Sequence, residues 1–356
     1  MKVFNFSAGP STLPKEVLLE AQKDFVDYKG TGMSVTEMSH RSKAYDEIHI
    51  EAIALLKKLL NISDEYEVLF VQGGASTQFS AVPLNLLHNK ADYILTGNFA
   101  KKAYEEAKRF GEINVCASSE DKNFTYIPEG KEINISKDAD YVHITQNNTV
   151  FGTRYINLPQ TDVPIVSDMS SNILSEVIDV NKFGLIYAGA QKNIAPAGVT
   201  IVIVRKDLIN QPQTICPTML MYKTHAKANS LYNTPPCFSI YMAMLVFRWL
   251  DKLGGIKEMQ KINEYKANLL YDYIDNSKMF KNNVEKKFRS IMNVIFNTGD
   301  QDLDAKFVKE ATEHGIISIK GYKLLGGMRA SIYNAMPVEG VEYLIDFMKK
   351  FEMENK

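Results

Sequence analysis

The sequence has few cysteines, no long apolar run and almost no net charge. Cys116, Cys216 and Cys237 are an odd number without CxxC or CxxxC spacing, which argues against a disulfide framework or a structural zinc site. No stretch approaches the roughly 20 apolar residues of a membrane helix, and the N-terminus lacks a long apolar segment. Lys and Arg total 41 against 42 for Asp and Glu, so charge gives no reason to favour nucleic acid or an anionic membrane as a partner. We therefore expect a soluble cytoplasmic protein with reduced thiols and no metal, which binds small anionic ligands locally.

Short apolar segments rich in β-branched residues alternate with helical patterns along most of the chain. Helices are expected over 12–30 and 43–60 and after Gly74, and strands over 67–72, 140–144, 164–167, 184–188 and 199–204. Parallel strands that are buried on both faces have this composition. The pattern predicts the α/β class, with a mostly parallel sheet in a large domain.

The alternation of strands and helices stops at 205–236, and the elements that follow come in a different order. Beyond about residue 260, helical patterns alternate with strand-like segments at 291–296, 316–319 and 329–333, which indicates a smaller α+β unit. A chain of 356 residues is long enough for a large and a small domain. We expect the large domain over 15–258, and a small domain formed by 1–14 together with 259–356.

Paired glycines end the first expected strand and open a helix in VQGGASTQF at 71–79. Backbone amides at Ala75 and Ser76 would point at an anion, helped by the helix dipole. An ordinary tight turn between strand and helix is the alternative interpretation. The segment matches neither GxGxxG nor a Walker loop, so dinucleotide and ATP sites lose their usual support.

Two titratable residues follow neighbouring apolar strands. Asp168, in IVSDMSSN, ends one strand at the edge where open α/β sheets bind ligands, although it could also cap the following turn. Lys192, in YAGAQKNIAPAG, follows the next strand between small residues; most lysines are solvated surface charges. A lysine desolvated at a strand end can instead lose its proton and attack an aldehyde. An acid and an amine at this spacing suit pyridoxal phosphate, which needs an anion for its ring nitrogen and an amine for its aldehyde.

Several motifs in the same order make the resemblance specific. The chain resembles the phosphoserine aminotransferases, a class V family of fold-type I enzymes that depend on pyridoxal phosphate. The motifs are FNFSAGPSTLP at 4–14, MSVTEMSHRS at 33–42, QGGASTQF at 72–79, TQNNTVFGT at 145–153, the Lys192 segment, SLYNTPP at 230–236 and GMRASIYNAMP at 327–337. The resemblance implies that Lys192 forms the Schiff base with the cofactor and that Asp168 keeps its ring nitrogen protonated.

The resemblance also assigns the other cofactor contacts. It implies that Ala75, Ser76 and Gln191 bind the cofactor phosphate, and that Thr149 contacts the polar edge of the ring. Phe99 falls where the family typically has a tryptophan stacked on the ring; a core aromatic is the alternative. Asn233 and Thr234 correspond to residues that reach the phosphate from the neighbouring subunit, although NTPP could also be a simple turn. The resemblance therefore implies a homodimer with shared active sites.

Substrate recognition requires groups that bind carboxylate and phosphate, a role that suits arginine. Arg329 resembles the family's clamp for the α-carboxylate, and His40 with Arg41 resemble binders of the side-chain anion donated across the dimer. The sequence departs from the family at Tyr322 and Lys323, where members commonly have His-Arg. Lysine offers a point charge instead of a planar fork.

The implied reaction transfers an amino group between L-glutamate and 3-phosphohydroxypyruvate in L-serine biosynthesis, giving O-phospho-L-serine and 2-oxoglutarate. In this scheme Lys192 moves the proton, and two half-reactions imply ping-pong kinetics. The departure at Tyr322 and Lys323 keeps a second interpretation open, a related aminotransferase for another small keto acid such as pyruvate or glyoxylate. A third, of another class, is a protein that binds pyridoxal phosphate without turnover.

Overall fold

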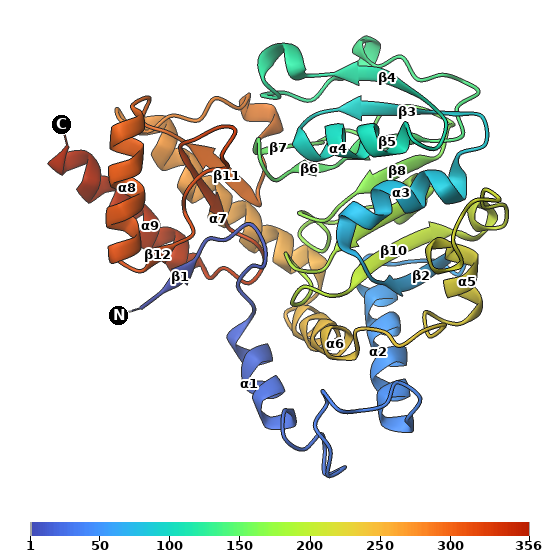
Figure 1. Cartoon of the computed structure of the whole chain (residues 1–356). Helices are drawn as coiled ribbons and strands as arrows, with labels where there is room; N and C mark the ends of the chain where they lie inside the picture. Colours follow the sequence, from blue (N-terminus) through green and yellow to red (C-terminus); the bar gives the residue numbers. More distant parts are fainter. Residues whose placement is uncertain (1, 356) are drawn as a thin grey trace.

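A seven-stranded sheet forms the centre of the chain in a computed structural model that describes residues 2–355 (Figure 1). Its strands are, in spatial order, β2 (Tyr66–Val71), β10 (Thr200–Arg205), β9 (Leu185–Gly189), β8 (Ile165–Asp168), β5 (Val142–Thr145), β3 (Lys90–Leu95) and β4 (Glu112–Ser118). Neighbouring strands from β9 to β4 pair in parallel, whereas β10 is antiparallel to both β9 and β2. The predicted α/β class with a mostly parallel sheet is confirmed.

Helices cover both faces of this sheet. On one face, α3 (Gly74–Leu86) and α4 (Asn98–Ala107) contribute to the core, and on the other α2 (Lys43–Leu60) and α6 (Cys237–Lys252) do so. Along β10, Val202 and Val204 belong to the first core, while Ile201 and Ile203 belong to the second. All four are buried, because neighbouring side chains of a strand point to opposite faces. Burial on both sides explains the continuous β-branched runs in the sequence.

The first helix is shorter than the sequence predicts. The apolar pattern predicted a helix over 12–30, but α1 spans Lys15–Asp24 and begins after Pro14 without a side-chain cap. Phe25, the next residue on the apolar face, is 51% exposed. Val17 and Ala21 on the same face are buried, so burial declines toward the end of the helix and does not extend it beyond Asp24. α2, by contrast, keeps the predicted bounds of 43–60.

A second core lies in the C-terminal part of the chain. It surrounds the antiparallel pair β11 (Asn293–Phe296) and β13 (Met328–Ser331), with α7 (Ile256–Asn276), α8 (Gln301–Glu313) and α9 (Val338–Glu354). β1 (Phe4–Asn5) pairs in parallel with β12 (Ile316–Ile317), so the N-terminal residues join this C-terminal unit (Figure 1). Separate cores support the division into 15–258 and 1–14 with 259–356, which stays a prediction. Met1 and Lys356, the ends of the predicted small domain, lie outside the described residues.

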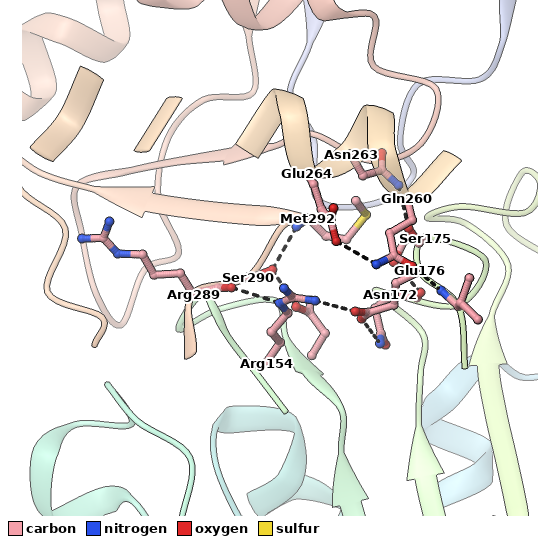
Figure 2. A network of polar contacts seen from close by, with 12 residues as sticks. Arg154, Asn172, Ser175, Glu176, Gln260, Asn263, Glu264, Arg289, Ser290 and Met292 are labelled. Atoms are coloured by element: carbon pink, nitrogen blue, oxygen red, sulfur yellow. Dashed lines mark hydrogen bonds and ion pairs between the residues drawn. The ribbon is translucent and has the colours of Figure 1, made fainter. Parts of the chain in front are cut away.

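Polar contacts join the C-terminal unit to the part of the chain that carries the sheet (Figure 2). Arg154 lies in the short strand β7 (Thr153–Arg154), which pairs with β6 (Asn147–Asn148). Its guanidinium donates to the carboxylate of Glu176 and, at 3.2 Å, to the backbone carbonyl of Arg289. Both partners of the ion pair are largely buried, so their removal from water must be compensated by these contacts.

The segment 205–236 is largely irregular, as predicted, with one short α-helix, α5 (Tyr222–Lys227). Within residues 2–355, no helix has both the length and the apolar character needed to cross a membrane. The same residues contain no group of three or more His, Cys, Asp or Glu that could hold a metal ion.

Candidate active site

The predicted acid and amine both lie where parallel strands end. Asp168 is the last residue of β8, and Lys192 follows β9, which is the neighbouring strand. Open α/β sheets bind ligands at the carboxyl ends of their strands. Thr149 reaches the same place from the segment after β6, because Lys192 Nζ donates a hydrogen bond to Thr149 Oγ1 at 2.8 Å. The structure thus brings together three residues that the sequence predicted for one site.

The environment of Lys192 favours a neutral amine. Burial lowers the pKa of Lys192 from 10.5 to about 8, with Asp168 acting in the opposite direction and Arg329 lowering it further. An appreciable fraction of the side chain is therefore unprotonated at neutral pH, and only the free amine is a nucleophile. The prediction of a surface charge, which the residue type alone favours, does not hold for this lysine.

Asp168 combines burial with partners for its charged form. The residue is 5% exposed, and burial raises its pKa, whereas Lys192 and a hydrogen bond from the Ser170 amide act to lower it. The Ser170 amide donates to Asp168 Oδ1 at 2.9 Å. The carboxylate therefore does brace the following turn, which was the alternative interpretation. It is also a buried anion that a cationic ring nitrogen would stabilise.

Phe99 lies in the first turn of α4 and borders this cluster. Lys192 Nζ is 5.6 Å from the centre of its ring. The ring is partly buried and packs against the small apolar cluster of Phe124, Val150 and Phe151. Phe99 is thus an aromatic wall beside the lysine and does not lie deep in the core.

The predicted anion site is an open helix end. α3 begins at Gly74, and its N-cap, Gly73, has a φ of 98° and provides no side-chain cap. A side chain at Gly73 would also approach Thr77 Oγ1 to 2.0 Å, so glycine is required for two reasons. The first amides of α3, which include Ala75 and Ser76, are left for an external anion.

Three further predicted cofactor residues flank these elements. Gln191 is held by its backbone, because its carbonyl accepts a hydrogen bond from the Ser11 amide at 2.9 Å. The carbonyl of Thr234 accepts from Gln72 Nε2 at 3.1 Å, and Asn233 lines a cavity of about 250 Å³ with Gln72. Asn233 and Thr234 therefore lie beside the glycine turn of their own chain.

Arg329, on β13, brings a guanidinium from the C-terminal unit. Within residues 2–355 its Nε is buried without a hydrogen-bond partner. Burial lowers the pKa of Arg329, and the groups that oppose this are two tyrosines, Tyr333 and Tyr322, not a carboxylate. Its charge in turn lowers the pKa of Lys192, which places the two cations near each other. A partly buried guanidinium beside the amine, whose Nε lacks a hydrogen-bond partner in the described chain, is a site for a carboxylate.

The remaining predicted substrate residues are dispersed. Tyr322 packs against the apolar cluster that Phe99 borders. Lys323 is exposed and lines a different cleft, together with Asp304. His40 and Arg41 lie in the segment between α1 and α2, which projects from the body of the chain (Figure 1). The roles of these residues stay predictions, and those of His40 and Arg41 require a second subunit.

One contact to the Lys192 loop was missed from the sequence. Ser11 Oγ donates a hydrogen bond to the backbone carbonyl of Lys192, in addition to the bond from its amide to Gln191. The residue lies in FNFSAGPSTLP, a motif that carried the resemblance but had no assigned role. Its position in a shared motif, before the first helix, was the available signal.

Comparison with known proteins agrees with this geometry. The family model described as aminotransferase class-V matches residues 3–344. The chain is 55% identical over 358 residues to a phosphoserine aminotransferase of Bacillus cereus, covering 100% of this chain and 99% of that protein. It is similar to the solved phosphoserine aminotransferase from Bacillus circulans subsp. alkalophilus, with a TM-score of 0.98, 47% identity and coverage of 100% and 99%. The pyridoxal-phosphate-bound phosphoserine aminotransferase from Trichomonas vaginalis has a TM-score of 0.94 and 39% identity, with coverage of 98% and 100%.

Proposed function

Because the chain belongs to the class V aminotransferase family, we propose that it is a phosphoserine aminotransferase of L-serine biosynthesis. It transfers the amino group between L-glutamate and 3-phosphohydroxypyruvate, giving O-phospho-L-serine and 2-oxoglutarate. The observation that carries this assignment is the full-length likeness at 55% identity to an enzyme of that name. Lys192, Asp168 and Arg329 supply the amine, the acid and the free guanidinium that such chemistry needs.

The cofactor is pyridoxal phosphate, and the groups present fit it. The open end of α3 at Ala75 and Ser76 suits its phosphate, with Gln191 nearby in the lysine loop. Asp168 would pair with its ring nitrogen. When bound, the cofactor supplies an aldehyde that condenses with amines and a ring that accepts electrons from the adjacent carbon.

Residues beside the lysine would hold the ring. Phe99 offers its aromatic face, and the Thr149 hydroxyl lies where the polar edge of the ring is expected. Asn233 and Thr234 lie beside the glycine turn of their own chain, and the resemblance implies that the same residues complete the phosphate site of a second subunit.

Lys192 would perform the proton transfer. Its neutral amine can take the proton from the α-carbon of the amino-acid substrate and return it to the acceptor carbon. Burial lowers its pKa to about 8, close to the pH at which the transfer must work in both directions. The Thr149 hydroxyl, 2.8 Å from Nζ, orients the amine between these positions.

Both substrates carry an α-carboxylate, and Arg329 is the group that would bind it. The second anionic group, carboxylate or phosphate, would be bound by His40 and Arg41 of a second subunit, with Tyr322 and Lys323 closing the same end. Exchange of one substrate for the other in a single pocket implies ping-pong kinetics. Parallel initial-rate lines are expected when both substrates are varied, and intersecting lines would contradict the scheme.

The proposal includes a homodimer in the cytoplasm. Apolar side chains are exposed on the N-terminal segment that carries His40 and Arg41, notably Leu18, Leu19, Phe25, Val26 and Met33. Such a patch is typical of a protein interface. The three cysteines are free thiols, as expected in a reducing compartment.

An absorbance titration of the holoenzyme tests the function. O-phosphoserine and glutamate should both change the spectrum of the bound cofactor, whereas alanine at the same concentration should not. A preferred response to alanine, reversed by pyruvate or glyoxylate, would indicate the related aminotransferase instead. If none of these amines changes the spectrum, the chain binds the cofactor without turnover.

A further inference from the structure

Four buried polar side chains lie between the loop of Lys192 and the strand of Arg329, and no cofactor or substrate role accounts for them. They are Asn193, Asn263, Lys266 and Asn334, with exposures of 5%, 0%, 0% and 4%. Buried polar groups are costly unless all their hydrogen bonds are made. Their contacts therefore show what this arrangement holds in place.

Asn193 and Asn334 join the two loops directly. Asn193 follows Lys192 in the chain, and Asn334 follows the strand that carries Arg329. The backbone amide of Asn334 donates to Asn193 Oδ1 at 3.0 Å, and Asn193 Nδ2 donates to the Ile173 carbonyl at 3.1 Å. One asparagine side chain thus connects the residue after the amine to the segment after the guanidinium.

The side chain of Asn334 extends these connections. Its Nδ2 donates to the Leu174 carbonyl at 2.9 Å, and its Oδ1 accepts from Asn263 Nδ2 at 2.8 Å. Asn263 Nδ2 also donates to the Ser175 carbonyl at 2.9 Å, and Figure 2 shows this pair beside the buried Arg154–Glu176 ion pair. The Asn334 amide is therefore tied to the central part of the chain directly through Nδ2, and indirectly through Asn263 of α7, which itself bonds to Ser175.

Lys266 fixes the backbone of the same segment. It lies on α7, one turn after Asn263, and its Nζ donates to the carbonyls of Ile332, Tyr333 and Met336 at 3.1, 2.8 and 3.0 Å. These carbonyls surround Asn334 in the chain. An ammonium can donate all three bonds at once, whereas a neutral amine can donate only two.

We propose that Asn193, Asn334 and Lys266 form a clasp that positions Arg329 relative to Lys192, and so sets the affinity for the α-carboxylate that both substrates share. This inference rests on the proposed function. The three residues are positioning residues, because they act through Arg329 and Lys192. A guanidinium displaced by a fraction of an ångström loses the paired geometry that a carboxylate requires.

The test compares two ligands that differ only in that carboxylate. O-phospho-L-serine and O-phosphoethanolamine share the amine and the phosphate, and each is titrated into the holoenzyme while the cofactor absorbance is recorded. The readout is the dissociation constant of O-phosphoethanolamine divided by that of O-phospho-L-serine. Arg329→Gln serves as the positive control, because it should remove most of the discrimination.

Asn193→Ala and Asn334→Ala should reduce this ratio by about tenfold, within the usual range of coupling between sites, by weakening phosphoserine and not phosphoethanolamine. Asn85→Ala is the matched control. Asn85 is also fully buried and makes hydrogen bonds to Ala81, Leu220 and Tyr222, but it lies in α3, remote from the clasp. It should lower stability and leave the ratio unchanged.

An unchanged ratio in the clasp variants, or a parallel loss of both affinities, would overturn the inference. If Asn334→Ala does not fold, Asn193→Ala decides the matter, because it removes the acceptor of the Asn334 backbone amide and leaves the side-chain contacts of Asn334 in place. Wild-type enzyme that binds both ligands equally would reject the role of Arg329, and the clasp with it. Wild-type enzyme that binds neither would reject the proposed function itself, which separates the two failures.

Discussion

Replacing Lys266 with methionine should remove a pH dependence of stability that this one buried ammonium creates. The side chain is 0% exposed, and burial lowers its pKa from 10.5 to about 7. The folded chain therefore holds this proton less tightly than the unfolded chain does. Below pH 7 both states are protonated, and above pH 10.5 neither is. Between these limits the unfolded state binds more protons, so the free energy of unfolding rises with pH.

The magnitude follows from the size of that window. Inside it, each pH unit adds about 1.4 kcal/mol to the free energy of unfolding. From pH 6 to pH 9 the contribution of Lys266 should therefore be roughly 3 kcal/mol. Lys266→Met also leaves the carbonyls of Ile332, Tyr333 and Met336 without their donor, which shifts stability at every pH. The diagnostic quantity is consequently the slope.

Urea unfolding followed by circular dichroism, at matched protein concentration between pH 6 and pH 9, measures this slope. At each pH, the free energy of unfolding of Lys266→Met is subtracted from that of the wild type, which cancels the contribution of groups that titrate equally in both. This difference should grow with pH in favour of the wild type. Parallel curves would refute the reasoning, because they would mean that the three carbonyls keep the pKa of the ammonium near its ordinary value.

Three further outcomes are expected at the active site. The rate at which the apoenzyme captures pyridoxal phosphate should rise with pH through about 8, because burial lowers the pKa of Lys192 to that value and only the free amine reacts. Stopped-flow absorbance measures this rate, and a flat profile from pH 6 to 9 would contradict the prediction. Asp168→Asn should reduce kcat at least about a hundredfold at saturating cofactor, because the ring nitrogen loses its anionic partner; steady-state assays beside cofactor titrations distinguish this from lost binding. Gly73→Ala should weaken cofactor binding and lower the free energy of unfolding by about 1–2 kcal/mol, because the N-cap needs a positive φ and the new methyl group meets Thr77. Unchanged cofactor affinity would reject the anion-binding role of this turn.

The sheet could be predicted from sequence because most of its strands are buried on both faces. β8, β9 and β10 are short, largely apolar runs, and burial makes such runs continuous. β3 and β4 were not predicted: Asp92 interrupts the apolar run of the buried β3, and β4 lies at the edge of the sheet with most of its residues at least partly exposed. The length of α1 was overestimated for a related reason. Its apolar pattern continues to Phe25, but Phe25 is half-exposed, whereas Val17 and Ala21 earlier on the same face are buried.

The chemistry of the site was only partly visible in the residues themselves. Lys192 has the type of a surface charge, and its role could be inferred only together with Asp168 and the ordered motifs around both. What lowers its pKa is burial at the end of β9, opposed by Asp168 and reinforced by Arg329. No local pattern predicts these contributions, because they arise when strands that are distant in sequence end at the same edge.

The contacts of the clasp could not be predicted from the sequence. Asn193 and Asn334 lie in two of the motifs that carry the resemblance, but no regular spacing connects them with Lys266, and Asn and Lys are residue types that are mostly exposed. Their relation exists only after the C-terminal unit has packed against the sheet, when the loops of Lys192 and Arg329 become neighbours. The amine and the guanidinium come from separate cores, so the distance between them cannot be set by either core alone. Contacts across the junction must fix it, and the hydrogen bond between Asn193 and Asn334 is the one that directly joins the loop of Lys192 to the segment after Arg329, in addition to the contacts of Arg154.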